Sequence, residues 1–328
     1  MDAADHAPQP KGPFAPKAPK ERYARVRLLG RGAFGEVWLF RDRFEGRLVA
    51  SKSISVRSRG GGSDLPKGAF REVMGLRQCE HENVIKLLDV VPGPGTLNLV
   101  LEYAPVDVSK IIDRAVEVPP LDVIKAITLG VLNALEHLHS QRLLHRDVKP
   151  GNLLLTMDGV MKLADFGLVT IFEEDASMTP TVATRWYRAP ELLYGAKKYG
   201  PPVDVWSTGC VLAELLLLRP LFRGCSDIDQ LSRVVRGRGT PSETRWPEAR
   251  ELPDFDKLCF PDSAPKPIAR MLCTCDDPFV LDLAERMLDI DPAMRISALD
   301  ALVHDAFFVP PMPASPSRLA DFIEHLAQ

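Results

Sequence analysis

Residues 144–167, LHRDVKPGNLLLTMDGVMKLADFG, hold several polar side chains between apolar segments. The polar groups are two carboxylates, an ammonium group and an amide, at Asp147, Asp165, Lys149 and Asn152. Carboxylates can accept a proton or bind a cation, and an ammonium group can neutralise an anion. The residues therefore either do chemistry on a charged substrate or are ordinary solvated loop charges.

Three glycines in LGRGAFGEVW, Gly30, Gly32 and Gly35, have the spacing G-x-G-x-x-G. This spacing alone also fits dinucleotide-binding folds and ordinary hairpins. A dinucleotide site needs a helix directly after the third glycine and an acidic residue about 20 positions further on. Here residues 36–40 read as a strand, and the charged residue 22 positions after Gly30 is Lys52. The pattern favours a glycine turn that folds over phosphates, because glycine lets the backbone approach anionic oxygens without a Cβ clash.

The elements that would position these residues change in kind along the chain. Alternating apolar and polar residues predict strands at 23–29, 35–40 and 47–54, and residues 96–107 read as a strand that leads into a turn. Between them, residues 57–66 predict a flexible break, and residues 67–79 have helical spacing, with Phe70, Val73 and Leu76 on one apolar stripe. The first part of the chain therefore reads as a small strand-rich lobe with one helix.

The rest of the chain is dominated by helical patterns. An i, i+3, i+4, i+7 spacing connects Ile124, Ile127, Val131, Leu132, Leu135 and Leu138. Residues 153–164 predict a hairpin that turns at Asp158 and Gly159. Residues 211–222 form the longest apolar run, but Glu214 and Arg219 interrupt it, so we expect a buried helix.

Composition limits the functional classes. The chain has 328 residues, 45% of them hydrophobic, and a formal net charge of -3, so no global basic field favours nucleic acid. The N-terminal segment lacks an apolar signal core, and its Pro, Ala and Lys content predicts a disordered arm. Without paired CxxC spacing, the cysteines are expected to be free thiols in a reducing compartment. They are Cys79, Cys210, Cys225, Cys259, Cys273 and Cys275.

Taken together, these features resemble the eukaryotic protein kinases. The matching residues, in order, are Gly30-x-Gly32-x-x-Gly35, Val49-Ala50-Ser51-Lys52, Glu72, His145-Arg146-Asp147, Asn152, Asp165-Phe166-Gly167, Ala189-Pro190-Glu191, Asp204 and Arg295. The resemblance implies an α+β, bilobal protein kinase fold, with a small antiparallel β-sheet lobe that carries one key helix and a larger helical lobe. The expected divisions are an N-terminal arm at 1–22, an N-lobe at 23–103, a C-lobe at 104–310 and a C-terminal tail at 311–328.

The resemblance gives the opening cluster its chemistry. Phosphoryl transfer from ATP depends on positioning and charge neutralisation more than on covalent help. Asp147 would orient or accept the proton of the attacking hydroxyl, and Lys149 would stabilise charge on the γ-phosphate. Asn152 and Asp165 are hard oxygen ligands that suit Mg²⁺. A lysine at position 149 is typical of Ser/Thr kinases.

Lys52 lies among small and apolar neighbours, and a half-buried lysine needs an anionic partner. Glu72, on the helix that follows, is the candidate partner. The pair would hold the ammonium group against the α- and β-phosphates of the nucleotide.

The nucleotide site implied by the resemblance draws on both lobes. Glu102 and Ala104 would offer backbone groups to adenine, Asp107 would reach the ribose, and Leu101 would be the gatekeeper. The full set is Leu29, Gly30, Gly32, Gly35, Val37, Ala50, Lys52, Glu102, Ala104, Asp107, Leu155 and Asp165.

Three further matching residues imply a structural role rather than a catalytic one. Asp204 resembles the helix-borne acid that holds the catalytic-loop backbone, and Glu191 and Arg295 resemble the buried ion pair of the larger lobe.

Residues 183–216 and 227–241 resemble the group that contains cyclin-dependent and MAP kinases. Within it the chain is similar to the cell cycle-related kinases, a cyclin-dependent-like branch associated with cilia and flagella. In this group an arginine, here Arg188, engages a backbone carbonyl of the P+1 loop, which here contains Ala183. The carbonyl then cannot accept a hydrogen bond from a substrate N–H. Proline has no N–H, so it is favoured directly after the target Ser or Thr.

Thr179 aligns with the activation-lip threonine of cyclin-dependent kinases, which implies regulation by phosphorylation. A phosphate there adds about -1.5 to -2 charge, which can order a loop against arginines. Arg71 and Arg146 match two of the family's three arginines, and Thr170 replaces the third. The phosphate is therefore expected to be held less tightly, or to be less necessary.

Residues 33–34 are Ala-Phe where many relatives have Thr-Tyr, so inhibitory phosphorylation there is chemically impossible. The expected cofactors are ATP and Mg²⁺, and the expected partners are proteins with Ser/Thr-Pro sites, a cyclin or cyclin-like activator and an upstream lip kinase, without nucleic acid or membrane. The cytoplasm or nucleus, with a cilium or flagellum, is the expected location. A pseudokinase scaffold and a dinucleotide-dependent enzyme are the alternatives.

Overall fold

The structure is a computed structural model, and it describes residues 22–32, 35–55, 67–173, 177–179 and 182–327. Three sequence-based predictions concern segments outside these residues. They are residues 1–21 of the N-terminal arm, the Ala-Phe pair at 33–34 and the break at 57–66.

The chain divides into two compact units, residues 1–63 with 88–103 and residues 64–87 with 104–328. The helix at 67–78 therefore groups with the second unit, whereas the sequence analysis places it in the N-lobe. The lobe boundaries stay a prediction.

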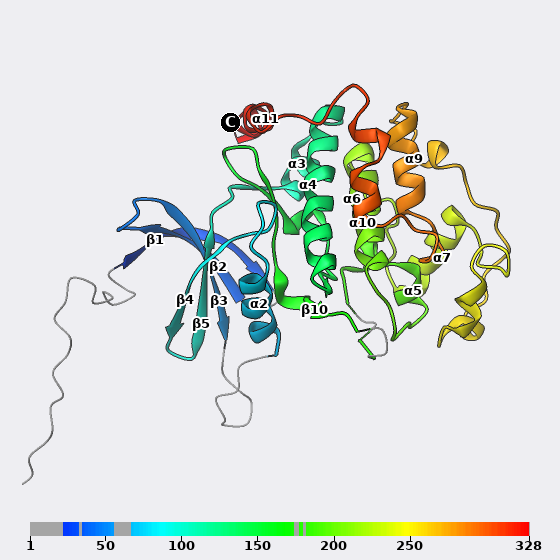
Figure 1. Cartoon of the computed structure of the whole chain (residues 1–328), viewed down its shortest axis with the longest axis horizontal. Coiled ribbons are helices and arrows are strands. Elements are labelled where there is room, and N and C mark those ends of the chain that lie inside the picture. The colour runs from blue at the N-terminus through cyan, green and yellow to red at the C-terminus, as the bar shows by residue number, and fades with distance from the viewer. Residues whose placement is uncertain (1–21, 33–34, 56–66, 174–176, 180–181, 328) are drawn as a thin grey trace, which may run out of the picture. The chain divides into compact units, whose positions relative to one another are not determined.

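The first unit is a five-stranded sheet in the order β1-β2-β3-β5-β4 (Figure 1). Its strands are β1 (Tyr23–Gly32), β2 (Gly35–Asp42), β3 (Leu48–Ser55), β4 (Leu87–Gly93) and β5 (Thr96–Glu102). The predicted strands are confirmed as β1, β2, β3 and β5. Leu39, Val49 and Leu99 fill the interior and are at most 4% exposed.

Gly35 shows why the turn between β1 and β2 needs glycine. Its φ is +138°, and a Cβ built on it would lie 1.9 Å from the carbonyl oxygen of Ser53 on β3. No L side chain fits this position, because both the backbone conformation and the space exclude it. A strand therefore follows the third glycine directly, as the sequence predicts, and no helix begins there.

The second unit is mainly helical. Its helices are α2 (Lys67–Gln78), α3 (Val108–Arg114), α4 (Leu121–Ser140), α5 (Pro190–Leu193), α6 (Pro202–Leu217), α7 (Asp227–Arg238), α8 (Ile268–Met271), α9 (Pro278–Met287), α10 (Ala298–Leu302) and α11 (Pro316–Ala327). Its short strands are β6 (Val106–Asp107), β7 (Leu143–Leu144), β8 (Leu153–Leu155), β9 (Met161–Leu163) and β10 (Thr170–Ile171). Figure 1 shows α4 and α6 side by side at the centre of this unit, where they pack on each other.

Helix α4 confirms the helical spacing read from the sequence. All six of its predicted apolar residues, from Ile124 to Leu138, are at most 1% exposed. Lys125 is buried among them, but its ammonium group lies 3.0 Å from Asp277 and donates to the carbonyl of Val309 at 3.2 Å. The buried charge is therefore paired, which burial requires.

Helix α2 corrects the predicted apolar stripe of Phe70, Val73 and Leu76. Phe70 is 59% exposed, and the buried side of the helix carries Ala69, Glu72 and Leu76 instead. The same three- and four-residue spacing fits both stripes, so the sequence pattern could not separate them. The buried carboxylate of Glu72 is the feature that hydrophobicity alone could not predict.

The β8–β9 hairpin is confirmed, with Gly159 at φ +78° in its turn. A Cβ at Gly159 would lie 1.9 Å from the carbonyl oxygen of Pro316, so helix α11 rests directly on this turn. Leu319 and Ile323 of α11 are buried. The C-terminal tail predicted at 311–328 thus contains a packed helix, and its bounds stay a prediction.

Helix α6 contains most of the longest apolar run and is buried from Val203 to Leu216, as predicted. None of the helices within the described residues is long and apolar enough to cross a membrane. All six cysteines are free, as the sequence predicts.

Glu191 and Arg295 form the predicted buried ion pair. The guanidinium group donates to both carboxylate oxygens, at 2.8 and 3.1 Å, and also to the carbonyl of Pro202. The two side chains are 4% and 0% exposed. The contact connects residues 104 positions apart in the sequence.

We expect Arg295→Leu to lower the free energy of unfolding by about 3–5 kcal/mol, because it leaves the carboxylate of Glu191 buried without its partner. Denaturant unfolding would measure this. Arg286→Leu is the matched control, since Arg286 pairs with Asp282 at the surface and such pairs contribute only about 0–1 kcal/mol. Equal effects of the two substitutions would contradict the prediction.

Candidate active site

The backbone that leads to Asp147 is held by one buried carboxylate. The backbone N–H groups of His145 and Arg146 donate to Asp204 at 2.9 and 2.7 Å, and His139 Nε2 lies 3.0 Å from it. Burial tends to raise the pKa of Asp204, but the hydrogen bond and charge of His139, with the other donors, lower the pKa below its ordinary value. Asp204 therefore remains a carboxylate, and Arg146 keeps a left-handed backbone at φ +64°.

The imidazole of His145 fixes the same turn from the other side. Its Nδ1 accepts the backbone N–H of Asp147 at 3.3 Å, and its Nε2 faces the carbonyl of Ala164 at 3.1 Å. Burial lowers the pKa of His145, so the ring is neutral, with its proton on Nε2. The Phe166 ring packs edge-on against it, with centroids 5.4 Å apart.

Asp147 is the point at which the predicted residues meet. Its Oδ2 accepts from Lys149 Nζ at 2.6 Å and from Asn152 Nδ2 at 3.0 Å. Its Oδ1 accepts from the backbone N–H and the hydroxyl of Thr184, both at 3.1 Å. The carboxylate is thereby fixed by donors from two separate segments, an arrangement that solvated loop charges would not produce. Thr184 was not predicted as a site residue, although it lies in the segment 183–216 that resembles the cyclin-dependent and MAP kinases.

Asn152 and Asp165 are brought to the same place by the main chain. The N–H of Ala164 donates to the carbonyl of Asn152 at 2.9 Å, so the hairpin returns the chain to Asn152 directly before Asp165. Asp165 itself has a left-handed backbone at φ +65°. Because the amide nitrogen of Asn152 donates to Asp147, its amide oxygen is the end left to act as a ligand.

This donor set fits Mg²⁺. One carboxylate and one amide oxygen, completed by phosphate oxygens and water, are the ligands this ion takes at phosphoryl-transfer sites. The described residues contain no cluster of three or more His, Cys, Asp and Glu side chains that could hold a metal without a substrate. Binding of Mg²⁺ together with a nucleotide stays a prediction.

Helix α2 belongs to this unit through the segment around Asp165. Gly75 faces Phe166 and Val169, and a Cβ on Gly75 would lie 3.2 Å from the Phe166 ring. The chain after α2 is tied to β9, because Ile85 N–H donates to the carbonyl of Leu163 at 3.0 Å. Glu72 is buried on this helix.

The predicted nucleotide residues divide between the two units. Those in the first unit are Leu29, Gly30, Gly32, Gly35, Val37, Ala50, Lys52 and Glu102, and those in the second are Ala104, Asp107, Leu155 and Asp165. In the sheet, Lys52 stands opposite Val37 on one neighbouring strand and Leu99 on the other. Lys52 and Glu72 are both buried and lie in different units, so their pairing stays a prediction.

Asp107 has a structural role that the sequence did not indicate. It is the N-cap of α3, where its carboxylate accepts the backbone N–H of Lys110 at 3.0 Å and pairs with the Lys110 ammonium at 2.8 Å. Burial tends to raise its pKa, but these donors lower the pKa below its ordinary value. A contact of Asp107 with the ribose stays a prediction.

The predicted contact between Arg188 and the P+1 loop is present. Arg188 donates to the carbonyls of Val182 and Ala183 at 2.9 and 3.2 Å, and Ala183 has φ +64°. Asp227 was not predicted from the sequence. Its carboxylate lies 3.0 Å from the guanidinium group of Arg188 and 2.8 Å from that of Arg185. The role of these residues with a substrate stays a prediction.

Thr179 is exposed, but its backbone is anchored. The hydroxyl of Tyr199 donates to the Thr179 carbonyl at 2.7 Å and accepts from Arg146 at 2.9 Å. Arg146 also donates to the carbonyl of Leu168 at 2.8 Å. Of the two predicted phosphate partners, Arg71 lies exposed on α2, whereas Arg146 is already engaged by Tyr199 and Leu168.

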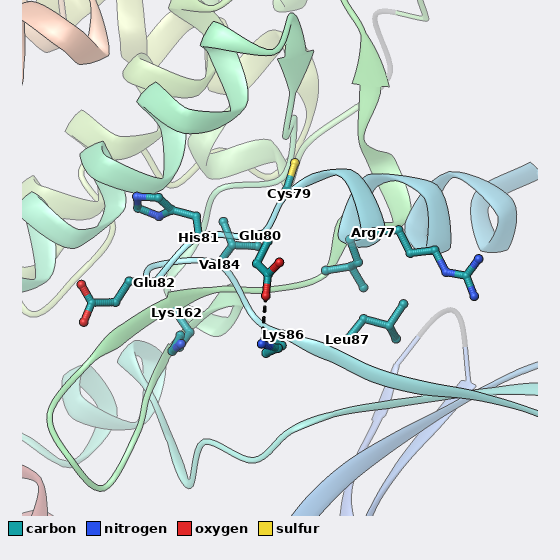
Figure 2. Close-up of a pocket in the computed structure, with 10 residues that line it drawn as sticks. Arg77, Cys79, Glu80, His81, Glu82, Val84, Lys86, Leu87 and Lys162 are labelled. Atoms are coloured by element: carbon teal, nitrogen blue, oxygen red, sulfur yellow. Dashed lines mark hydrogen bonds and ion pairs between the residues drawn. The ribbon is translucent and has the colours of Figure 1, made fainter. Parts of the chain in front are cut away.

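A separate hollow of about 490 Å³ lies in the second unit at the end of α2 (Figure 2). Glu80 and Lys86 in its lining point toward each other in Figure 2, with their charged atoms 2.9 Å apart. His81 at its edge stacks on His137, and burial together with that neighbour lowers the pKa of His81. Among the described residues that line this hollow, none is a predicted site residue.

The catalytic turn, the hairpin after it and the anchored P+1 loop define a protein kinase. Residues 23–308 match the family model described as Protein kinase domain, and the chain belongs to this family. It is similar to Cyclin-dependent kinase D-1 of Oryza sativa subsp. indica, with 41% identity over 301 residues, which are 91% of this chain and 70% of that protein. Cyclin-dependent kinase 20 of Homo sapiens is 39% identical over 302 residues, 91% of this chain and 86% of that protein.

These likenesses confirm the resemblance read from the sequence. Cyclin-dependent kinase 20 is also called cell cycle-related kinase, and the chain is an ATP-binding serine/threonine protein kinase of the cyclin-dependent kinase type. Its fold is the expected α+β kinase fold. The dinucleotide-dependent alternative is thereby excluded.

We expect Asp147→Asn to leave ATP binding nearly intact and to lower kcat by at least about 100-fold, or about 2.7 kcal/mol of barrier, because the amide cannot take the proton. Phosphate transfer and nucleotide titration would measure the two effects. Asp158→Asn is the matched control, since Asp158 is an exposed carboxylate in the hairpin turn. Unchanged turnover in the Asp147 variant would refute its role.

Proposed function

We propose that this kinase transfers the γ-phosphoryl group of Mg²⁺-bound ATP to serine or threonine residues that precede proline. The observation that carries the proposal is the immobilised carboxylate of Asp147, which is held by Lys149, Asn152 and Thr184. This geometry favours an active enzyme over a pseudokinase scaffold, because a scaffold would not require the carboxylate to be fixed in this way.

Each residue of the site has a distinct role in the proposed reaction. Asp147 orients the substrate hydroxyl and takes its proton, while Lys149, 2.6 Å away, faces the charge that develops on the transferred group. Asn152 and Asp165 would hold Mg²⁺, which when bound neutralises phosphate charge. Lys52, for which we propose Glu72 as the partner, would hold the remaining phosphates. Thr184 keeps the carboxylate of Asp147 in position.

The preference for proline rests on the Ala183 carbonyl. Arg188 already occupies this acceptor, so the N–H of an ordinary residue after the target Ser or Thr would lack a partner there. An unpaired N–H costs about 1–3 kcal/mol when it is buried. Proline has no N–H and avoids this cost.

We expect kcat/KM for a Ser-Pro peptide to exceed that for the matched Ser-Ala peptide by at least about tenfold, or about 1.4 kcal/mol. Steady-state kinetics on the purified enzyme would give the ratio. Arg188→Gln should narrow the ratio, because it frees the Ala183 carbonyl. Arg185→Gln, which removes a partner of the same Asp227, should not. A ratio near one in the unsubstituted enzyme would disprove the proposed preference.

The activating partners follow from the relatives. Proteins named cyclin-dependent kinases imply protein substrates and a cyclin-type activator in general. We propose that such an activator contacts α2, since Phe70 and Met74 on this helix are 59% and 48% exposed. A location in the cytoplasm or nucleus, and at a cilium or flagellum, is proposed from the resemblance alone.

Phosphorylation of Thr179 by an upstream kinase is proposed as an aid to activity rather than a strict requirement. Thr170 replaces one arginine, and Arg146 is already bonded to Tyr199 and to the Leu168 carbonyl. The Thr179 backbone is therefore anchored through Tyr199 without a phosphate.

We expect Thr179→Ala to reduce kcat/KM by less than about tenfold, because the anchor through Tyr199 uses the carbonyl and survives the substitution. Comparison of the lip-phosphorylated enzyme with this variant would measure the loss. Ser177→Ala serves as the control, since Ser177 is an exposed hydroxyl two residues away. Complete inactivation of the Thr179 variant would show that the phosphate is indispensable.

A further inference from the structure

The sheet of the first unit carries a groove of about 520 Å³. Val49 and Ser51 of β3 line it. Successive residues of a strand point to opposite faces, so Ala50 and Lys52 point away from the groove. The groove is therefore separate from the residues predicted to bind the nucleotide.

The groove suits an apolar segment. Val49 and Val100 form its floor and are at most 2% exposed, while Tyr23, Phe40 and Pro94 also line it. Two of its polar side chains already have partners in the sheet: the Asn98 amide nitrogen donates to the carbonyl of Val91 at 3.2 Å, and the Tyr23 hydroxyl donates to Asp89 at 3.1 Å. The volume falls within the range of about 300–1,000 Å³ that is usual for ligand clefts.

The described part of the chain begins at Arg22, directly before Tyr23, which lines this groove. Arg22 lies 2.8 Å from Asp42 and 3.9 Å from Asp89, and the hydroxyl of Tyr23 donates to Asp89 at 3.1 Å. Burial and Asp89 raise the pKa of Tyr23 to about 12, so the hydroxyl keeps its proton. Because Tyr23 both lines the groove and begins β1, the segment that precedes it is tethered at the groove.

That segment has a proline at every third position, Pro10, Pro13, Pro16 and Pro19. A polyproline II helix has three residues per turn, so this spacing would place all four prolines on one side. Aromatic-lined grooves bind such segments because the extended form costs little entropy to fix. The segment also carries Lys11, Lys17 and Lys20, whose charge complements the partly exposed carboxylate of Asp89, the hydrogen-bond partner of Tyr23.

We propose that residues 10–20 of this chain bind in the groove of their own sheet, with the proline side against Tyr23 and Phe40. Pro19 is only four positions before Tyr23, so the segment is present at an effective concentration in about the millimolar range. Weak intrinsic affinity is then sufficient. Docking covers the apolar face of the sheet, and it does not depend on the substrate of the kinase.

Site-specific modification of a cysteine in the full chain would test this. In Val91→Cys, N-ethylmaleimide should modify Cys at position 91 at least about fivefold faster when Pro10, Pro13, Pro16 and Pro19 are all replaced by serine, because the covering segment is lost. Mass spectrometry of the peptide that contains position 91 separates this thiol from the native ones. Val26→Cys is the matched control, since Val26 is 51% exposed on β1 and does not line the groove.

Three results would overturn the proposal. The first is an unchanged rate at position 91 after the four substitutions, and the second is an equal change at position 26. The third is protection that disappears when the protein is diluted about 100-fold, because an intramolecular contact does not depend on protein concentration. That result would point to a second copy as the occupant.

Discussion

The carboxylate of Asp204 is the constraint on which the rest of the catalytic region depends. It accepts two consecutive backbone N–H groups, from His145 and Arg146, in a site with no exposed surface. Those bonds hold Arg146 in a left-handed conformation, which a non-glycine residue adopts only when its surroundings impose it. The direction in which Asp147 leaves the turn is set by this conformation. A helix that contributes no reacting group thus determines where the reacting carboxylate lies.

The environment of Asp147 shows how two distant segments are made to depend on each other. Lys149 and Asn152 belong to its own loop, whereas Thr184 belongs to the P+1 loop, which is itself held by Arg188. If the P+1 loop moves, the carboxylate loses the donors on Oδ1. Recognition of the substrate and orientation of the base are therefore linked through a single side chain.

Sequence patterns predicted the parts of the fold that have a local cause. The glycine turn at Gly35, the hairpin at Gly159 and helix α4 follow from residue type and spacing over a few positions. The hydrogen bonds that Thr184 donates to Asp147 and the ion pair of Arg188 with Asp227 could not be predicted. Residues about 40 positions apart leave no periodic signal in the sequence. The burial of Glu72 in place of Phe70 escaped prediction for another reason, since both choices satisfy helical spacing and only packing decides between them.

Helix α11 has a consequence for how the protein matures. It presses on the turn of the hairpin that ends just before Asp165, and it is the last of the described elements to be synthesised. A nascent chain can form the catalytic hairpin before α11 leaves the ribosome, but the hairpin then lacks one of its supporting walls. The turn of this hairpin, which lies at the end opposite Asn152 and Asp165, therefore gains its full support only after α11 has been synthesised and has packed against it.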